Sequence, residues 1–156
     1  MESNYLSPQS ISLQVSAMNW QDAVQASGDL LVKNGKCEPR YIDAMLQVAK
    51  EKGPYMVIAP GLALMHARPE DGALQVGMSI VSLSTPVHFG SEANDPVELV
   101  IAFCGIDHHS HIKMLKELAN FLMDENNQNM LRSSISKDKV ITAFRRSRQE
   151  TVPCQN

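Results

Sequence analysis

The chain has 156 residues, of which 44% are hydrophobic and 20% charged, a composition typical of one globular domain and unlike that of a disordered chain. Its net charge of −3 disfavours broad binding to nucleic acid. The three cysteines are widely spaced, without a CxxC pair, which indicates neither a disulfide framework nor a cysteine zinc site. Since the sequence shows neither a signal peptide nor a membrane-spanning apolar run, we expect a soluble, cytoplasmic protein with reduced thiols.

The first half of the chain alternates between the period of a strand and that of a helix. Residues 11–15 alternate apolar and polar side chains, as a half-buried strand does. Asn19 and Pro39 each stand where the first turn of a helix is expected, ahead of an apolar stripe. The expected elements are a strand at 11–15, a helix from Trp20 to the turn at Gly35, a helix from Pro39 to near Gly53, and a short strand at 55–59.

The second half contains a strand pattern without polar alternation. Residues 97–106 are nearly all apolar, which is typical of a strand covered on both faces. Apolar residues at helical spacing predict a helix over 107–126. The other expected elements are a longer strand at 74–83, a short strand at 87–89, and short helices around Met130 and over 136–145.

Strands that alternate with helices favour the α/β class. We therefore expect one domain with a mixed, partly parallel β-sheet that is flanked by helices on both faces. Residues 1–146 are assigned to this domain. Residues 147–156 are predicted to form a disordered C-terminal tail.

The segment after the 55–59 strand carries a pattern suited to phosphoryl chemistry. Pro60 cannot donate to a strand ladder and Gly61 permits a sharp turn, so a shaped, exposed loop is expected to follow. That loop holds His66 and Arg68. A neutral imidazole can attack a phosphoryl group while a nearby guanidinium holds the oxygens of that group. The pair therefore predicts a phosphate acceptor at His66, with Arg68 in contact with the phosphate.

A second histidine cluster, at residues 107–111, directly follows the apolar strand at 97–106. If this strand and the 55–59 strand run parallel, their trailing loops meet at the edge where open α/β sheets bind ligands. His66 and His111 are then neighbours. The amides that open the next helix would favour an anionic group between the two rings.

These residues resemble a known family. The segment 54–72, Pro-Tyr-Met-Val-Ile-Ala-Pro-Gly-Leu-Ala-Leu-Met-His-Ala-Arg-Pro-Glu-Asp-Gly, looks like the active-site segment of enzyme IIA components of the bacterial phosphoenolpyruvate-dependent sugar phosphotransferase system (PTS), mannitol/fructose superfamily. The start of the second helix at 38–41, the entry at 53–55 and the loop at 60–63 look most like the ascorbate-type enzyme IIA. The resemblance extends over about residues 10–145.

The resemblance implies roles for individual residues. By position, His66 matches the histidine that is transiently phosphorylated, as a tele-phosphohistidine, and His111 matches the second, phosphate-stabilising histidine. An arginine in the preceding helix of the mannitol type corresponds roughly to the 50–52 segment, so Lys50 or Lys52 would supply its charge. The chain departs from the family at Met65 and Ala67, where proline and glycine are common around the active histidine.

The resemblance also implies partners. The phosphocarrier protein HPr would deliver the phosphoryl group to His66, and a cysteine of the cognate enzyme IIB would receive it. The membrane component, enzyme IIC, would be involved indirectly, in the uptake of ascorbate or a related sugar acid. A homo-oligomer is compatible with the sequence.

Phosphoryl transfer can proceed by positioning and charge stabilisation, so no cofactor and no metal are expected. We expect one ring nitrogen of His66 to donate to a backbone carbonyl, which leaves the other free for attack. Two other functions stay open. One is a IIA-like regulatory phosphoprotein, and the other is a metal-binding or hydrolytic protein that uses His108, His111 and Cys104. Cys104 is otherwise expected to be a buried packing residue.

Overall fold

A five-stranded mixed sheet forms the centre of the chain in the computed structural model, which describes residues 6–133 and 136–151. β1 pairs with β4 in parallel and β3 with β5 in parallel, whereas β4–β5 and β2–β3 are antiparallel. The expected mixed, partly parallel sheet is therefore confirmed. In spatial order the strands are β1 (Ile11–Val15), β4 (Gly77–Val87), β5 (Val97–Cys104), β3 (Leu62–Met65) and β2 (Val57–Ala59).

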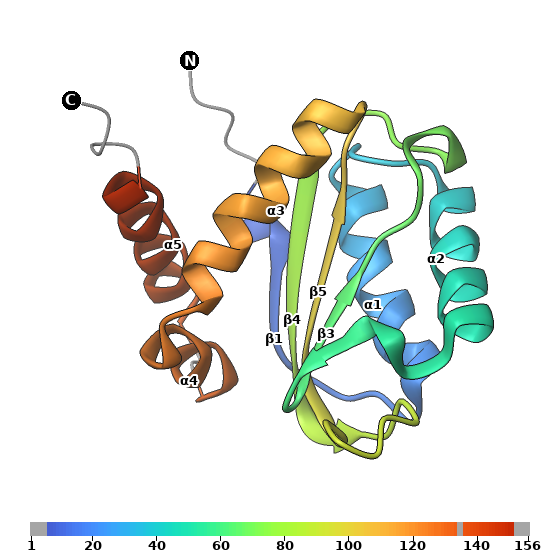
Figure 1. Ribbon diagram of the computed structural model, residues 1–156, viewed down its shortest axis with the longest axis horizontal. Helices are drawn as coiled ribbons and strands as arrows, with labels where there is room; N and C mark the ends of the chain where they lie inside the picture. Colours follow the sequence, from blue (N-terminus) through green and yellow to red (C-terminus); the bar gives the residue numbers. More distant parts are fainter. Residues whose placement is uncertain (1–5, 134–135, 152–156) are drawn as a thin grey trace.

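Helices cover both faces of this sheet (Figure 1). Helices α1 (Trp20–Lys33) and α2 (Pro39–Lys52) pack on one face, and α3 (His108–Leu122), α4 (Glu125–Ser133) and α5 (Lys137–Thr151) pack on the other. Successive side chains of a strand point to opposite faces, so β5 contributes to both cores. Ala102 and Cys104 belong to the core under α1 and α2, and Ile101 and Phe103 to the core under α3 to α5.

Local sequence explains where the helices begin. The Asn19 side chain accepts a hydrogen bond from the Asp22 amide (2.9 Å) ahead of α1, and Pro39 occupies the first turn of α2. The Asp107 carboxylate accepts a hydrogen bond from the Ser110 amide (2.8 Å) and so caps α3. The remaining short elements are the 3-10 helices η1 (Pro8–Ser10), η2 (Gly53–Met56) and η3 (Pro69–Asp71).

The strand before the site differs from the sequence prediction. The chain is extended over Val57–Ala59 (β2), because Gly53–Met56 forms the 3-10 helix η2. Gly61, at φ 75°, then turns the chain into β3, a strand that was not predicted. The four residues of β3 are all apolar and three of them are buried, so no period-two alternation marked this segment as a strand. His66 consequently follows β3 and not an open loop after residue 59.

Two further boundaries moved. The strand expected at 74–83 is β4, which covers Gly77–Val87 and reaches the first residue of the short strand expected at 87–89. Helix α5 continues to Thr151, so the tail expected from residue 147 is helical in its first five residues. Residues 152–156 lie outside the described part of the chain. Among the helices that are described, none combines the length and the apolar character needed to cross a bilayer.

Candidate active site

The parallel pairing of β3 with β5 brings two functional side chains together. Met65 and Ala102 are the last partners in this ladder, so the next residues, His66 and Phe103, emerge side by side at the carboxyl edge of the sheet. Their rings stack, with centroids 4.8 Å apart and an interplanar angle of 23°. Phe103 is fully buried, and His66 is partly exposed. The buried phenyl ring thus forms a platform for the imidazole.

His111 completes a cluster of three rings. Its centroid lies 5.2 Å from that of His66 and 5.1 Å from that of Phe103. Gly105 makes this approach possible, because a Cβ atom at residue 105 would lie 3.1 Å from the His111 amide nitrogen and 3.2 Å from its Cα. The structure therefore brings His66 and His111 together, as predicted from the two strands that precede them. The strand that precedes His66 is β3, however, and not the strand expected at 55–59.

The His66 ring is held without the hydrogen bond that we expected. Its Nδ1 atom is enclosed and has no hydrogen-bond partner among the described residues, so the predicted donation from one ring nitrogen of His66 to a backbone carbonyl does not occur at Nδ1. Orientation comes instead from stacking on Phe103. Because the ring is partly exposed and Nδ1 is enclosed, Nε2 is the nitrogen on the accessible side.

Both imidazoles favour the neutral form. Burial, and secondly the charge of His111, lower the pKa of His66 from its ordinary value of 6.5. Burial, and secondly His108, likewise lower the pKa of His111. Two neutral rings therefore line the site at neutral pH, and a neutral ring is the form in which histidine acts as a nucleophile.

A cleft of about 650 Å³ opens in front of these rings. The first turns of α3 contribute His108 and His111, and α2 contributes Val48 and Lys52 among others. The segment 66–69 and Asp71 line the remaining wall. The cleft thus lies at the sheet edge between helices from opposite faces, which is the place where open α/β sheets bind ligands.

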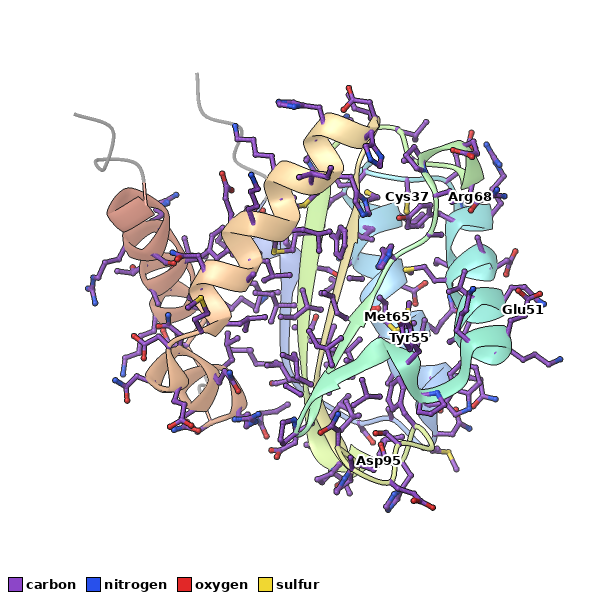
Figure 2. The ribbon with its side chains drawn as sticks, viewed as in Figure 1. Cys37, Glu51, Tyr55, Met65, Arg68 and Asp95 are labelled. Carbon is purple, nitrogen blue, oxygen red and sulfur yellow. The ribbon has the colours of Figure 1, made fainter. Side chains whose placement is uncertain are left out.

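The cationic residues named from the sequence occupy different places. Arg68 lies beyond the end of β3 (Figure 2) and is among the residues that line the cleft. Its side chain is 74% exposed and pairs with Asp71 (Nε to Oδ2, 3.4 Å). Lys52 lines the cleft, whereas Lys50 lies beside separate depressions near Trp20. The placement favours Lys52 over Lys50 as a source of positive charge.

The residues of the alternative metal site do not converge. His108 and His111 both line the cleft. The Cys104 thiol is buried on the other side of β5, 3.3 Å from the Gln75 carbonyl oxygen. Within residues 6–133 and 136–151, no group of three or more histidine, cysteine, aspartate or glutamate side chains is arranged to hold a metal ion. Burial of Cys104 confirms the expectation that it is a packing residue.

Two residues beside the cleft could not be predicted from the sequence. Phe103 was counted as one of many apolar residues of a central strand, and Tyr41 as part of the apolar stripe of a helix. Tyr41 is completely buried and its hydroxyl oxygen lies 2.9 Å from the Ala67 amide. The parallel register of β3 and β5 would have identified Phe103, but β3 itself was not predicted.

The fold is that of phosphotransferase-system enzyme IIA components. The family model described as "Phosphoenolpyruvate-dependent sugar phosphotransferase system, EIIA 2" matches residues 4–147. The chain therefore belongs to this family of enzyme IIA components, which are phosphotransferases that relay phosphoryl groups.

Individual relatives agree with this assignment. The chain is 40% identical over 139 residues to the ascorbate-specific PTS system EIIA component of Escherichia coli K12, covering 88% of this chain and 90% of that protein. The solution structure of the cryptic mannitol-specific enzyme IIA of Escherichia coli matches with a TM-score of 0.82 and 34% identity, over 91% of this chain and 96% of that one. A complex of the mannitol enzyme IIA with phosphorylated enzyme IIB, also from Escherichia coli, matches with a TM-score of 0.78 and 29% identity, over 89% and 96%.

Proposed function

We propose that this chain is the phosphocarrier enzyme IIA of an ascorbate-type uptake system, in which His66 receives the phosphoryl group. The observation that carries the proposal is the placement of the His66 ring. The ring stacks on Phe103, its Nδ1 atom is buried, and it faces a cleft beside His111. This arrangement suits a single nucleophilic nitrogen, Nε2, held in a fixed direction.

Each transfer exchanges one bond to phosphorus for another. Nε2 of His66 attacks the phosphoryl group of phospho-HPr, the P–N bond to the HPr histidine breaks, and that imidazole leaves with its electron pair. In the second transfer a thiolate of enzyme IIB attacks, and the new bond from Nε2 to phosphorus breaks. Because the lowered pKa keeps His66 neutral, no proton has to leave this ring before attack.

The groups around the cleft would stabilise the charge that is transferred. His111 is neutral in the free protein because burial lowers its pKa, and a dianionic phosphoryl group nearby would favour its protonation. Lys52 and the opening amides of α3 add positive potential. Arg68 would contact the phosphoryl group after exchanging its Asp71 partner for it.

The physiological setting rests on the relatives. Ascorbate, or a related sugar acid, is supported by the 40% identical ascorbate-specific protein. Enzyme IIB as the acceptor is supported by the mannitol complex, and HPr would be the donor. The membrane component, enzyme IIC, would act one step later, so the reaction at His66 would take place in the cytoplasm without contact with the sugar.

Phosphorylation in a reconstituted chain tests this proposal. Purified protein is incubated with phosphoenolpyruvate, enzyme I and HPr, and acid-labile phosphate is measured by intact-mass spectrometry. The wild type and a His88→Ala control, whose histidine side chain is 80% exposed and lies outside the cleft, should each gain one phosphoryl group. His66→Ala should gain none.

Adding the cognate enzyme IIB should then remove the phosphoryl group from the wild type. A wild-type protein that stays unmodified, or a His66→Ala variant that is still phosphorylated, would contradict the proposal. Phosphorylation without transfer to enzyme IIB would instead favour a regulatory phosphoprotein.

A further inference from the structure

The Tyr41 hydroxyl lies between the two strand ends that carry the site. Tyr41 belongs to α2 and is fully buried. Its oxygen accepts a hydrogen bond from the Ala67 amide (2.9 Å), and it lies 2.9 Å from the Phe103 carbonyl oxygen and 3.1 Å from the Ala67 carbonyl oxygen. One phenolic group thus contacts the residue after His66 and the residue on which His66 stacks.

These contacts begin where the sheet ladder stops. The last paired residues of β3 and β5 are Met65 and Ala102, so no further ladder pair fixes His66 against Phe103. The hydroxyl can bridge this gap, because it accepts from one strand end and donates its single proton to the other. Burial raises the pKa of Tyr41, so the group keeps the proton that it donates.

We propose that Tyr41 is a positioning residue for phosphoryl transfer, whose hydroxyl holds the two strand ends at the spacing at which the His66 imidazole stacks on Phe103. The inference rests on the proposed function of His66. It explains how the His66 ring keeps one orientation although Nδ1 has no hydrogen-bond partner in the described part of the chain. The hydroxyl acts on the backbone of the site and does not touch the phosphoryl group.

Tyr41→Phe tests the role, since it removes the hydroxyl and keeps the ring. The expected result is a fall of about 10-fold in kcat for phosphorylation by phospho-HPr, with KM for HPr unchanged. The pKa of His66, measured by NMR titration of the ring, should rise toward its ordinary value as the imidazole becomes more hydrated.

Ser79→Ala is the matched control. The Ser79 hydroxyl is also fully buried and donates to a backbone carbonyl, that of Ser27, at 2.8 Å, but it faces α1 and not the cleft. Its loss should lower the thermal midpoint and leave kcat and the pKa of His66 unchanged. If Tyr41→Phe behaves in the same way, Tyr41 has a merely structural role and the proposal is overturned.

Hydrogen exchange in the wild type covers the case in which Tyr41→Phe does not fold. The bridge predicts slow exchange of the Ala67 amide, whereas exchange as fast as that of an open loop would overturn it. These experiments distinguish a failure of the proposed function from a failure of the proposed role of Tyr41. If the wild type takes up no phosphate, the proposed function fails, while the pKa of His66 in Tyr41→Phe and the exchange of Ala67 still decide the role of Tyr41.

Discussion

The two ends of β5 place buried polar groups in opposite situations. Before the strand, the Asp95 side chain is 10% exposed and accepts hydrogen bonds from the amides of Phe89, Gly90 and Ser91 at 2.7–3.0 Å. Beside the other end of the strand, next to Phe103, Nδ1 of His66 is enclosed with no partner among the described residues. Figure 2 shows Asp95 at the far end of the molecule from Arg68.

The difference separates stability from reactivity. A buried carboxylate with several amide donors fixes a loop and contributes to folding. A buried nitrogen without a partner costs free energy and persists where function requires it. We therefore expect substitutions at the Asp95 end to change stability, and substitutions at the His66 end to change transfer.

Replacing Asp95 should have the largest effect on stability. Asp95→Ala leaves three amides of the 89–91 segment without their acceptor, so the free energy of unfolding should fall by about 3 kcal/mol. Urea denaturation at neutral pH measures this change. The rate of phosphorylation per folded molecule should not change. A loss below about 1 kcal/mol, or a slower transfer, would break the proposed separation.

Replacing Phe103 should affect the other end. Phe103→Leu removes the platform for His66, and we expect transfer to slow by about 10-fold and the free energy of unfolding to fall by about 1 kcal/mol. Phe121→Leu is the control, because Phe121 is equally buried in the same core but contacts the Phe144 ring edge-on. Equal transfer rates in the two variants would show that the Phe103 ring only fills the core and does not position His66.

The pH dependence should sharpen the contrast. Because the pKa of His66 is lowered from 6.5, the unfolded chain binds more protons than the folded one just below this pH. The free energy of unfolding is therefore at its full value above pH 6.5 and falls as the pH drops through the window below it. His66→Gln should weaken this dependence in urea titrations at several pH values. An unchanged slope would show that the ring is not held in its neutral form.

The smallest expected effect distinguishes two lysines of α2. Lys52 lines the cleft and Lys50 does not, so Lys52→Ala should slow transfer by about 3-fold, with Lys50→Ala as the control. Steady-state phosphorylation by phospho-HPr at low salt measures both. Equal rates for the two variants would remove Lys52 from the site.

Local signals in the sequence predicted much of the fold. Asn19 and Pro39 mark helix starts that the structure confirms. The apolar run at 97–106 correctly indicated a strand buried on both faces, β5. These features depend on the chemistry of a few adjacent residues, and so the sequence alone shows them.

The site required information about pairing that a linear pattern does not contain. β3 is short and almost entirely buried, so its sequence shows no strand period, and without β3 neither the stacking of His66 on Phe103 nor the Tyr41 bridge could be predicted. The helical spacing of α2, in contrast, does separate Lys50 from Lys52, because residues one turn apart lie on the same face of a helix. Lys52 follows Val48, another cleft residue, by one turn, whereas Lys50 follows Leu46, which lines a separate depression.

The position of the phosphoryl group on the ring tests the central claim most directly. NMR of the phosphorylated protein, labelled with nitrogen-15 in its histidines, identifies the residue and the nitrogen bound to phosphorus. We predict Nε2 of His66, since Nδ1 is enclosed beside Phe103. Phosphorus on Nδ1, or on any other residue, would contradict the account.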